Sequence, residues 1–93
     1  MKTTQVAGTH DAGDVMLFAL STCGWCRKAR QLLDTNSVAY EYVYVDLAQG
    51  AERDEVTREL GKWTSRQGFP TTIVNGEVII GYDEEKLKKA LRL

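Results

Sequence analysis

The sequence predicts an α/β domain in which a four-stranded mixed sheet is flanked by helices, with the element order βαβαββα. Three observations support this prediction: a continuous apolar run at 15–20, a helical spacing of apolar residues after it, and an Asn75-Gly76 hairpin signal. A chain of 93 residues corresponds to one domain. Residues 1–14 are polar and rich in Gly and Thr, so we expect a flexible N-terminal tail and a single domain over 15–93.

The first half of the chain has the pattern of a strand–helix–strand unit. The run at 15–20 has no polar face, which is typical of a central strand covered on both sides. Ser21 and Thr22 are expected to form a turn and the N-cap of a helix over 23–35. Aromatic and β-branched residues at 39–45 predict the next strand, and the helical connection predicts that the two strands are parallel.

The second half predicts a helix, a hairpin and a last helix. The helix covers 51–63, with an inner stripe of Val56, Leu60 and Trp63. Pro70 precedes a strand at 71–74, and Asn75-Gly76 returns the chain as a strand at 77–80. Asp83 is then expected to cap the last helix, which has acidic residues in its first turn and basic residues near its end.

Composition excludes several classes of function. Hydrophobic residues make up 43% of the chain and charged residues 27%, with a net charge of −1, so charge gives no reason to expect nucleic acid or an anionic membrane as a partner. No apolar stretch approaches the ~18 residues that span a bilayer. The N-terminal segment lacks the apolar region of a signal peptide. We therefore expect a cytoplasmic monomer.

The residues Cys23-Gly24-Trp25-Cys26 predict redox chemistry. A C-x-x-C motif that follows a buried strand and opens a helix is typical of thioredoxin-like oxidoreductases. Unpaired N–H groups at the helix start favour a thiolate, so Cys23 is expected to be the attacking nucleophile. Cys26 falls on the inward face of the helix and is expected to resolve the mixed disulfide. Arg27 adds positive charge nearby, although a solvated basic face explains it equally well.

Structural uses of the two cysteines are less consistent with the sequence. A disulfide inside four residues closes a very short loop and adds little stability, and a reducing compartment disfavours it. A structural zinc site needs four ligands, whereas this chain has two cysteines and one remote histidine, His10. We therefore expect no metal site within the chain.

Three separated motifs resemble those of the glutaredoxin family, over roughly 15–91. They are Thr22-Cys23-Gly24-Trp25-Cys26-Arg27, Phe69-Pro70-Thr71 and Gly81-Tyr82-Asp83. The resemblance implies a thioredoxin-like (glutaredoxin) fold and a disulfide oxidoreductase whose substrate groove is lined by the residues of these motifs. It further implies that Pro70 is cis, that the Phe69 backbone lies beside Cys23, and that Asp83 holds the γ-glutamyl group of glutathione, although a plain N-cap explains Asp83 equally well.

Two departures from the family pattern leave the reductant open. Leu20 stands where members that use glutathione usually have lysine, and Ile80-Gly81 replaces their usual Gly-Gly. No cofactor is obligatory, and glutathione is the expected co-substrate. Alternatively, the chain resembles redoxins that are reduced by thioredoxin reductase and pass electrons to a reductase. A third alternative also follows from the resemblance: some glutaredoxins in which Gly or Ser replaces the proline of the usual Cys-Pro-Tyr-Cys motif bridge a glutathione-ligated [2Fe–2S] cluster between two subunits, and Gly24 permits this. Disulfide-bearing proteins or small molecules would be the substrates.

Overall fold

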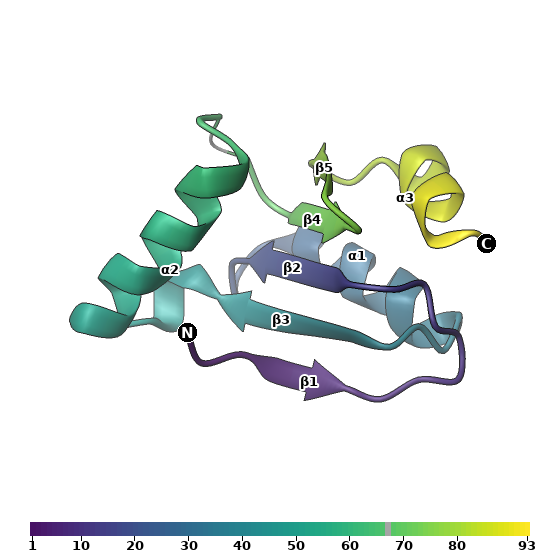
Figure 1. The fold of residues 1–93 in the computed structure, drawn as a ribbon, viewed down its shortest axis with the longest axis horizontal. Helices are drawn as coiled ribbons and strands as arrows, with labels where there is room; N and C mark the ends of the chain where they lie inside the picture. Colours follow the sequence, from purple (N-terminus) through teal and green to yellow (C-terminus); the bar gives the residue numbers. More distant parts are fainter. Residues whose placement is uncertain (67) are drawn as a thin grey trace.

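The computed structural model describes residues 1–66 and 68–93 and contains a five-stranded sheet of order β1-β3-β2-β4-β5 (Figure 1). The strands are β1 (Thr4–Val6), β2 (Val15–Ala19), β3 (Tyr40–Tyr44), β4 (Thr71–Val74) and β5 (Glu77–Ile80). The helices are α1 (Gly24–Thr35), α2 (Ala51–Trp63) and α3 (Glu84–Leu91), and a 3₁₀ turn, η1 (Val45–Leu47), follows β3. Among the described residues, no helix combines the length and the apolar composition needed to cross a membrane.

The two strands of the strand–helix–strand unit are parallel, as predicted. β2 and β3 pair in parallel with Leu17 opposite Tyr42, and α1 connects them behind the sheet in the view of Figure 1. β4 runs antiparallel to β2, with Thr72 opposite Leu17, and β5 returns beside β4 through the Asn75-Gly76 turn. Because β2 and β3 are parallel, their carboxyl termini lie at the same end of the strands, and the dithiol follows β2 at that end.

Two apolar clusters cover the two faces of the sheet. The alternation along β2 divides its side chains between them, because successive strand residues point to opposite faces. One cluster joins the sheet to α1 and α3, and its buried members include Leu17, Ala19, Cys26, Ala29, Leu33, Leu87 and Leu91. The other joins the sheet to α2 through Phe18, Val43, Val56 and Ile73. Cys26 therefore belongs to the core.

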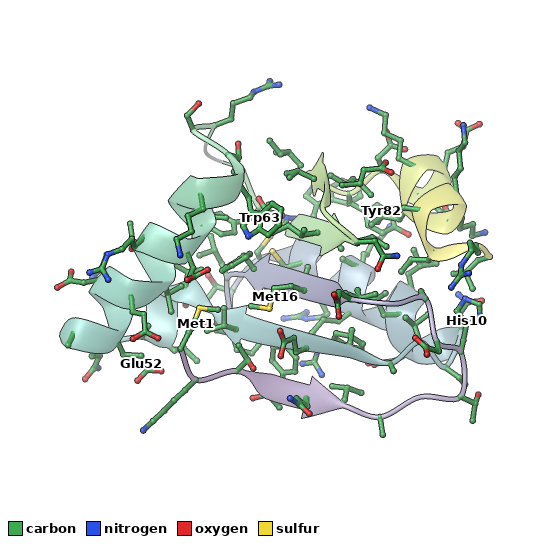
Figure 2. The ribbon with its side chains drawn as sticks, viewed as in Figure 1. Met1, His10, Met16, Glu52, Trp63 and Tyr82 are labelled. Atoms are coloured by element: carbon green, nitrogen blue, oxygen red, sulfur yellow. The ribbon has the colours of Figure 1, made fainter. Side chains whose placement is uncertain are left out.

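The sheet has five strands and not the four predicted, because the segment 1–14, which was expected to be a tail, contains one of them. β1 lies in this segment and pairs antiparallel with β3, which makes a fifth strand. His10 then pairs with Val38, and its Nε2 atom lies 2.6 Å from the Leu91 carbonyl oxygen, beside the end of α3 in Figure 2. Without β1, the outer edge of β3 would carry unpaired backbone N–H and C=O groups, so another strand can pair there. Local composition does not reveal this partner, because it is distant from β3 in the sequence.

Trp63 is also placed differently from the prediction of an inner stripe on α2. Val56 is fully buried, whereas Trp63 keeps 44% of its surface exposed. It is the last residue of α2, so its ring is not enclosed by a following helical turn. It lines a shallow groove with Met1 and Met16 on the α2 side of the sheet (Figure 2).

Candidate active site

The dithiol lies where the chain leaves the sheet and enters α1. Cys23 itself is the N-cap of the helix, in place of the expected Thr22, and its Sγ accepts a hydrogen bond from the Cys26 backbone N–H at 3.2 Å. The sulfur therefore occupies the place that a Ser or Thr oxygen takes at most helix starts. This arrangement directs the unpaired N–H groups of the first turn at the Cys23 sulfur.

The two cysteines have opposite electrostatic environments. Burial alone would raise the pKa of Cys23, but hydrogen bonds from the Cys26 thiol and from the N–H groups of Cys26 and Trp25 shift that pKa below its ordinary value. Burial raises the pKa of Cys26 to about 12, and the hydrogen bond with Cys23 acts in the same direction. Cys26 is 1% exposed. Of the two thiols, only Cys23 therefore has a pKa below the ordinary value of a cysteine.

The Phe69-Pro70-Thr71 motif forms the wall opposite the dithiol. The Phe69–Pro70 peptide bond is cis, as the family resemblance implies, and the Phe69 carbonyl oxygen lies 4.0 Å from Cys23 Sγ. The Pro70 carbonyl accepts a 2.7 Å hydrogen bond from the Gly81 N–H, which fixes the third motif beside the second. The Thr71 side chain is fully buried and donates to the Gly68 carbonyl, so it does not face the groove.

An aromatic pair joins the first and third motifs. The rings of Trp25 and Tyr82 stack with centroids 5.9 Å apart, and Lys28 Nζ lies 5.1 Å from the Trp25 ring centre. Trp25 is 58% exposed, so the pair presents a flat apolar surface beside Cys23. Asp83 caps α3 by accepting a hydrogen bond from the Lys86 N–H at 3.1 Å.

The remaining predicted site residues are less involved in these contacts. Thr22, Gly24 and Arg27 are exposed, and among the described residues no side-chain hydrogen bond or ion pair joins them to the rest of the site. A Cβ atom added at Gly24 would have no heavy atom within 4 Å outside the neighbouring residues and the helix backbone, so the helix start is open there.

Sequence reasoning missed Asp46, which lies in η1, two residues after the end of β3. Its carboxylate oxygens accept hydrogen bonds from the Ser21 backbone N–H, at 2.8 Å, and from the Ser21 hydroxyl. Both hydrogen bonds lower the pKa of the Asp46 carboxyl, and the bond from the Ser21 hydroxyl has the larger effect. A signal was available, because an acidic residue at the end of the strand parallel to β2 must lie near the start of α1.

Comparison with known proteins gives a consistent result. The glutaredoxin family model matches residues 15–79 of this chain. The chain is similar to the crystal structure of a glutaredoxin from Methanosarcina mazei Go1, with a TM-score of 0.85 and 37% identity over 100% of this chain and 90% of that one.

Two further solved structures are informative. Methanoredoxin from Methanosarcina acetivorans has a TM-score of 0.83 and 37% identity, covering 89% of this chain and 88% of that one. A buckwheat glutaredoxin solved in complex with glutathione has a TM-score of 0.62 and 25% identity, covering 81% of this chain and 66% of that one.

Proposed function

The chain belongs to the glutaredoxin family and is a thiol oxidoreductase, and from this premise we propose that it reduces glutathione mixed disulfides and protein disulfides through Cys23 and Cys26. The observation that supports this assignment best is the contrast between the two thiols. Cys23 is partly exposed with a lowered pKa, while Cys26 is buried one helical turn away with a raised pKa. Such a pair provides one nucleophile and one protected resolving thiol.

The proposed reaction has two exchange steps. The Cys23 thiolate attacks one sulfur of a substrate disulfide, forms an S–S bond with it and expels the other sulfur as a thiolate, which takes up a proton. Cys26 then gives up its proton and attacks Cys23 Sγ, which expels the second substrate sulfur and leaves a Cys23–Cys26 disulfide. The substrate gains the two electrons that the dithiol loses. With a glutathione mixed disulfide, a second glutathione replaces Cys26, so Cys23 alone is sufficient.

The groove beside Cys23 suits an extended thiol compound. The Phe69 backbone lies on one side of the sulfur, where it can pair with a short added strand. The Trp25–Tyr82 stack gives an apolar contact surface, and Asp83 lies at the α3 start, where the family holds the γ-glutamyl group. We propose that Thr22, Gly24, Arg27, Pro70 and Gly81 complete this groove, with Thr71 supporting it from the core.

A substitution series tests the assignment of the nucleophile. Cys23→Ser should abolish reduction of both a glutathione mixed disulfide and a protein disulfide, because no second thiol is exposed among the described residues. Cys26→Ser should retain reduction of the glutathione mixed disulfide and lose that of the protein disulfide. Activity of Cys23→Ser on either substrate would overturn the proposed function.

A coupled NADPH assay run in two arms identifies the reductant. One arm contains glutathione and glutathione reductase, and the other contains thioredoxin reductase. We propose glutathione, because Asp83 is in place at the α3 start and the family includes a member crystallised with it. Leu20 and Ile80 favour the thioredoxin-reductase arm, and turnover in that arm alone would reassign the chain to a redoxin that donates electrons to a reductase.

The open helix start at Gly24 also supports a second candidate, a cluster-bridged dimer. Within residues 1–66 and 68–93, no three His, Cys, Asp or Glu side chains are grouped to hold a metal, so a [2Fe–2S] cluster needs ligands from glutathione and from a second copy. Anaerobic purification with glutathione distinguishes the two functions. A colourless monomer supports the reductase alone, and a brown dimer that contains glutathione supports the cluster protein.

A further inference from the structure

The loop that presents Cys23 is attached to the rest of the molecule at Ser21. Between the end of β2 and the start of α1, the chain leaves the sheet and loses the hydrogen bonds of its ladder. Asp46, in η1 two residues after the carboxyl end of β3, accepts from both the N–H and the hydroxyl of Ser21. These two bonds cross 25 residues of sequence and end two residues before the nucleophile.

The same loop contacts both thiols. The Leu20 N–H, immediately before Ser21, points at Cys26 Sγ at 3.5 Å, and the Leu20 carbonyl accepts from the Cys23 N–H at 3.3 Å. A shift of Ser21 would therefore move both contacts. It would also turn Cys23 Sγ away from the Cys26 N–H that it caps.

We propose that Asp46 is a positioning residue for the reaction, because its carboxylate holds Ser21 and thereby keeps Cys23 at the start of α1. This inference rests on the proposed function, in which Cys23 is the nucleophile. Asp46 touches neither thiol in any hydrogen bond of the described residues, so its action is indirect and passes through the loop.

The charge of Asp46 and its hydrogen bonds have opposite effects on a thiolate nearby. Its negative charge disfavours thiolates, and it is among the influences that raise the pKa of Cys26. Its hold on the loop favours the Cys23 thiolate, since the groups that lower the pKa of Cys23 all lie on α1: the Cys26 thiol and the N–H groups of Cys26 and Trp25. From the facing loop, Phe69 contributes only a neutral carbonyl. Loss of the positioning role should raise the pKa of Cys23, whereas loss of the negative charge should lower it. The direction of the change in a variant therefore distinguishes the two roles.

The test measures how fast Cys23 reacts with iodoacetamide between pH 5 and 9, with mass spectrometry to assign the modified thiol. Asp46→Ala removes charge and hydrogen bonds together. We expect the pH midpoint to rise by about half a unit or more, toward the value of about 8.5 for an ordinary thiol. The reaction at pH 7 should then be about threefold slower. A lost charge alone would lower the midpoint instead.

Conservative variants complete the design. Asp46→Asn removes the charge and retains an oxygen that can accept from the Ser21 N–H, so its midpoint should stay at or below that of the wild type. Ser21→Ala removes one of the two bonds and should raise the midpoint by less than Asp46→Ala does. Asp54→Asn, at an exposed position in the first turn of α2, is the matched control and should leave the midpoint unchanged.

Two outcomes would overturn the proposal: an Asp46→Ala midpoint at or below the wild-type value, or a rise in Asp46→Asn equal to that in Asp46→Ala. Where Asp46→Ala does not fold, Ser21→Ala decides, and an unchanged midpoint in that variant counts against positioning. Alkylation requires no disulfide substrate and no reductase. A failure of this proposal is therefore distinct from activity of Cys23→Ser, which would contradict the proposed function itself.

Discussion

Cys23 and Cys26 differ because of where each sulfur lies relative to α1. Cys23 caps the helix and receives its N–H groups, while Cys26 packs against the sheet in the α1–α3 cluster. The helix start thus stabilises one thiolate, and the core suppresses the other. This contrast also makes the stability of the reduced protein depend on pH.

We predict that the reduced protein loses stability on the alkaline side. The pKa of Cys26 is about 12 in the folded chain against an ordinary 9.0, so the folded state retains a proton that the unfolded state releases. The stabilisation is complete below about pH 9 and declines as the pH rises toward 12, and Tyr40, raised by burial to a pKa of about 12, adds to the loss. Urea unfolding at pH 7.5 and 10 should show a larger loss for the wild type than for Cys26→Ala. An equal loss in both would contradict the assignment.

Thr71 and Thr72 provide a matched pair on β4. Both are buried, but Thr71 donates to the Gly68 carbonyl, whereas Thr72 Oγ1 has no hydrogen-bond partner among the described residues. Thr72→Val should leave the free energy of unfolding unchanged or raise it by about 1 kcal/mol, and Thr71→Val should lower it by about 1–3 kcal/mol. Chemical denaturation of the two variants checks the contrast. Equal destabilisation by both would count against it.

The β4–β5 hairpin is fixed to the start of β2 through its turn. The Asn75 side chain accepts from the Asp14 N–H at 2.8 Å and donates to the Ala12 carbonyl at 2.7 Å. Gly13, with φ of +96°, packs so closely that a Cβ atom there would lie 2.2 Å from Asn75 Oδ1. Asn75 therefore also fixes the backbone of residues 12–14, which lead into the central strand β2.

Asn75→Gly separates these two roles. Glycine adopts the positive φ of 50° that Asn75 has, so the turn can still form, but both side-chain hydrogen bonds are lost. We expect the free energy of unfolding to fall by about 1–3 kcal/mol. Thermal and urea unfolding measure the change, with Glu77→Gln at an exposed β5 position as the control. A variant as stable as the wild type would show that the side-chain bonds contribute nothing.

The elements that sequence reasoning located correctly are those with local signals. The bounds of α2, β4 and β5 match the prediction, because helical periodicity, Pro70 and Asn75-Gly76 each act within a few residues. β1 was missed because its partner strand begins more than thirty residues later, at Tyr40. Trp63 was assigned to the core because the periodicity of a helix does not show where the neighbouring sheet ends.

The active site was predictable to a similar degree. The dithiol and the Asp83 cap each follow from a motif of a few residues, and the cis proline follows from the resemblance to the glutaredoxin family. The Asp46–Ser21 contact depends on the pairing of two parallel strands, and the Trp25–Tyr82 stack on the relative placement of α1 and α3. Both arise from the assembled molecule, so no single segment shows them.

At the scale of the whole molecule, the N-terminal segment covers the edge of the sheet. β1 supplies the hydrogen bonds that β3 would otherwise leave open, and the Met1 amino group pairs with Glu55 of α2. Exposed strand edges can pair with other chains. The segment thus leaves a three-residue strand at this edge of the sheet in place of the five-residue β3, and it also contacts the helix over its face.

Deletion of residues 1–7 should therefore lower the melting temperature and promote self-association, while the chain still folds. The cluster that contains Cys26 has no buried member from β1, although Val6 of β1 packs against it. Differential scanning calorimetry and size-exclusion chromatography with light scattering measure the two effects. Deletion that changes neither would restore the interpretation of this segment as a tail.

The position of Cys26 also bears on oxidative damage. In the proposed role of nucleophile, the Cys23 thiolate attacks a peroxide oxygen, which gives a sulfenic acid and releases the rest of the peroxide as water or an alcohol. One helical turn away, Cys26 can condense with that sulfenic acid, releasing water and leaving a disulfide that a reductant can restore. A second oxidation, to the irreversible sulfinic acid, then has little time to occur. The thiol that the core keeps inert toward solvent thus protects its neighbour from permanent inactivation.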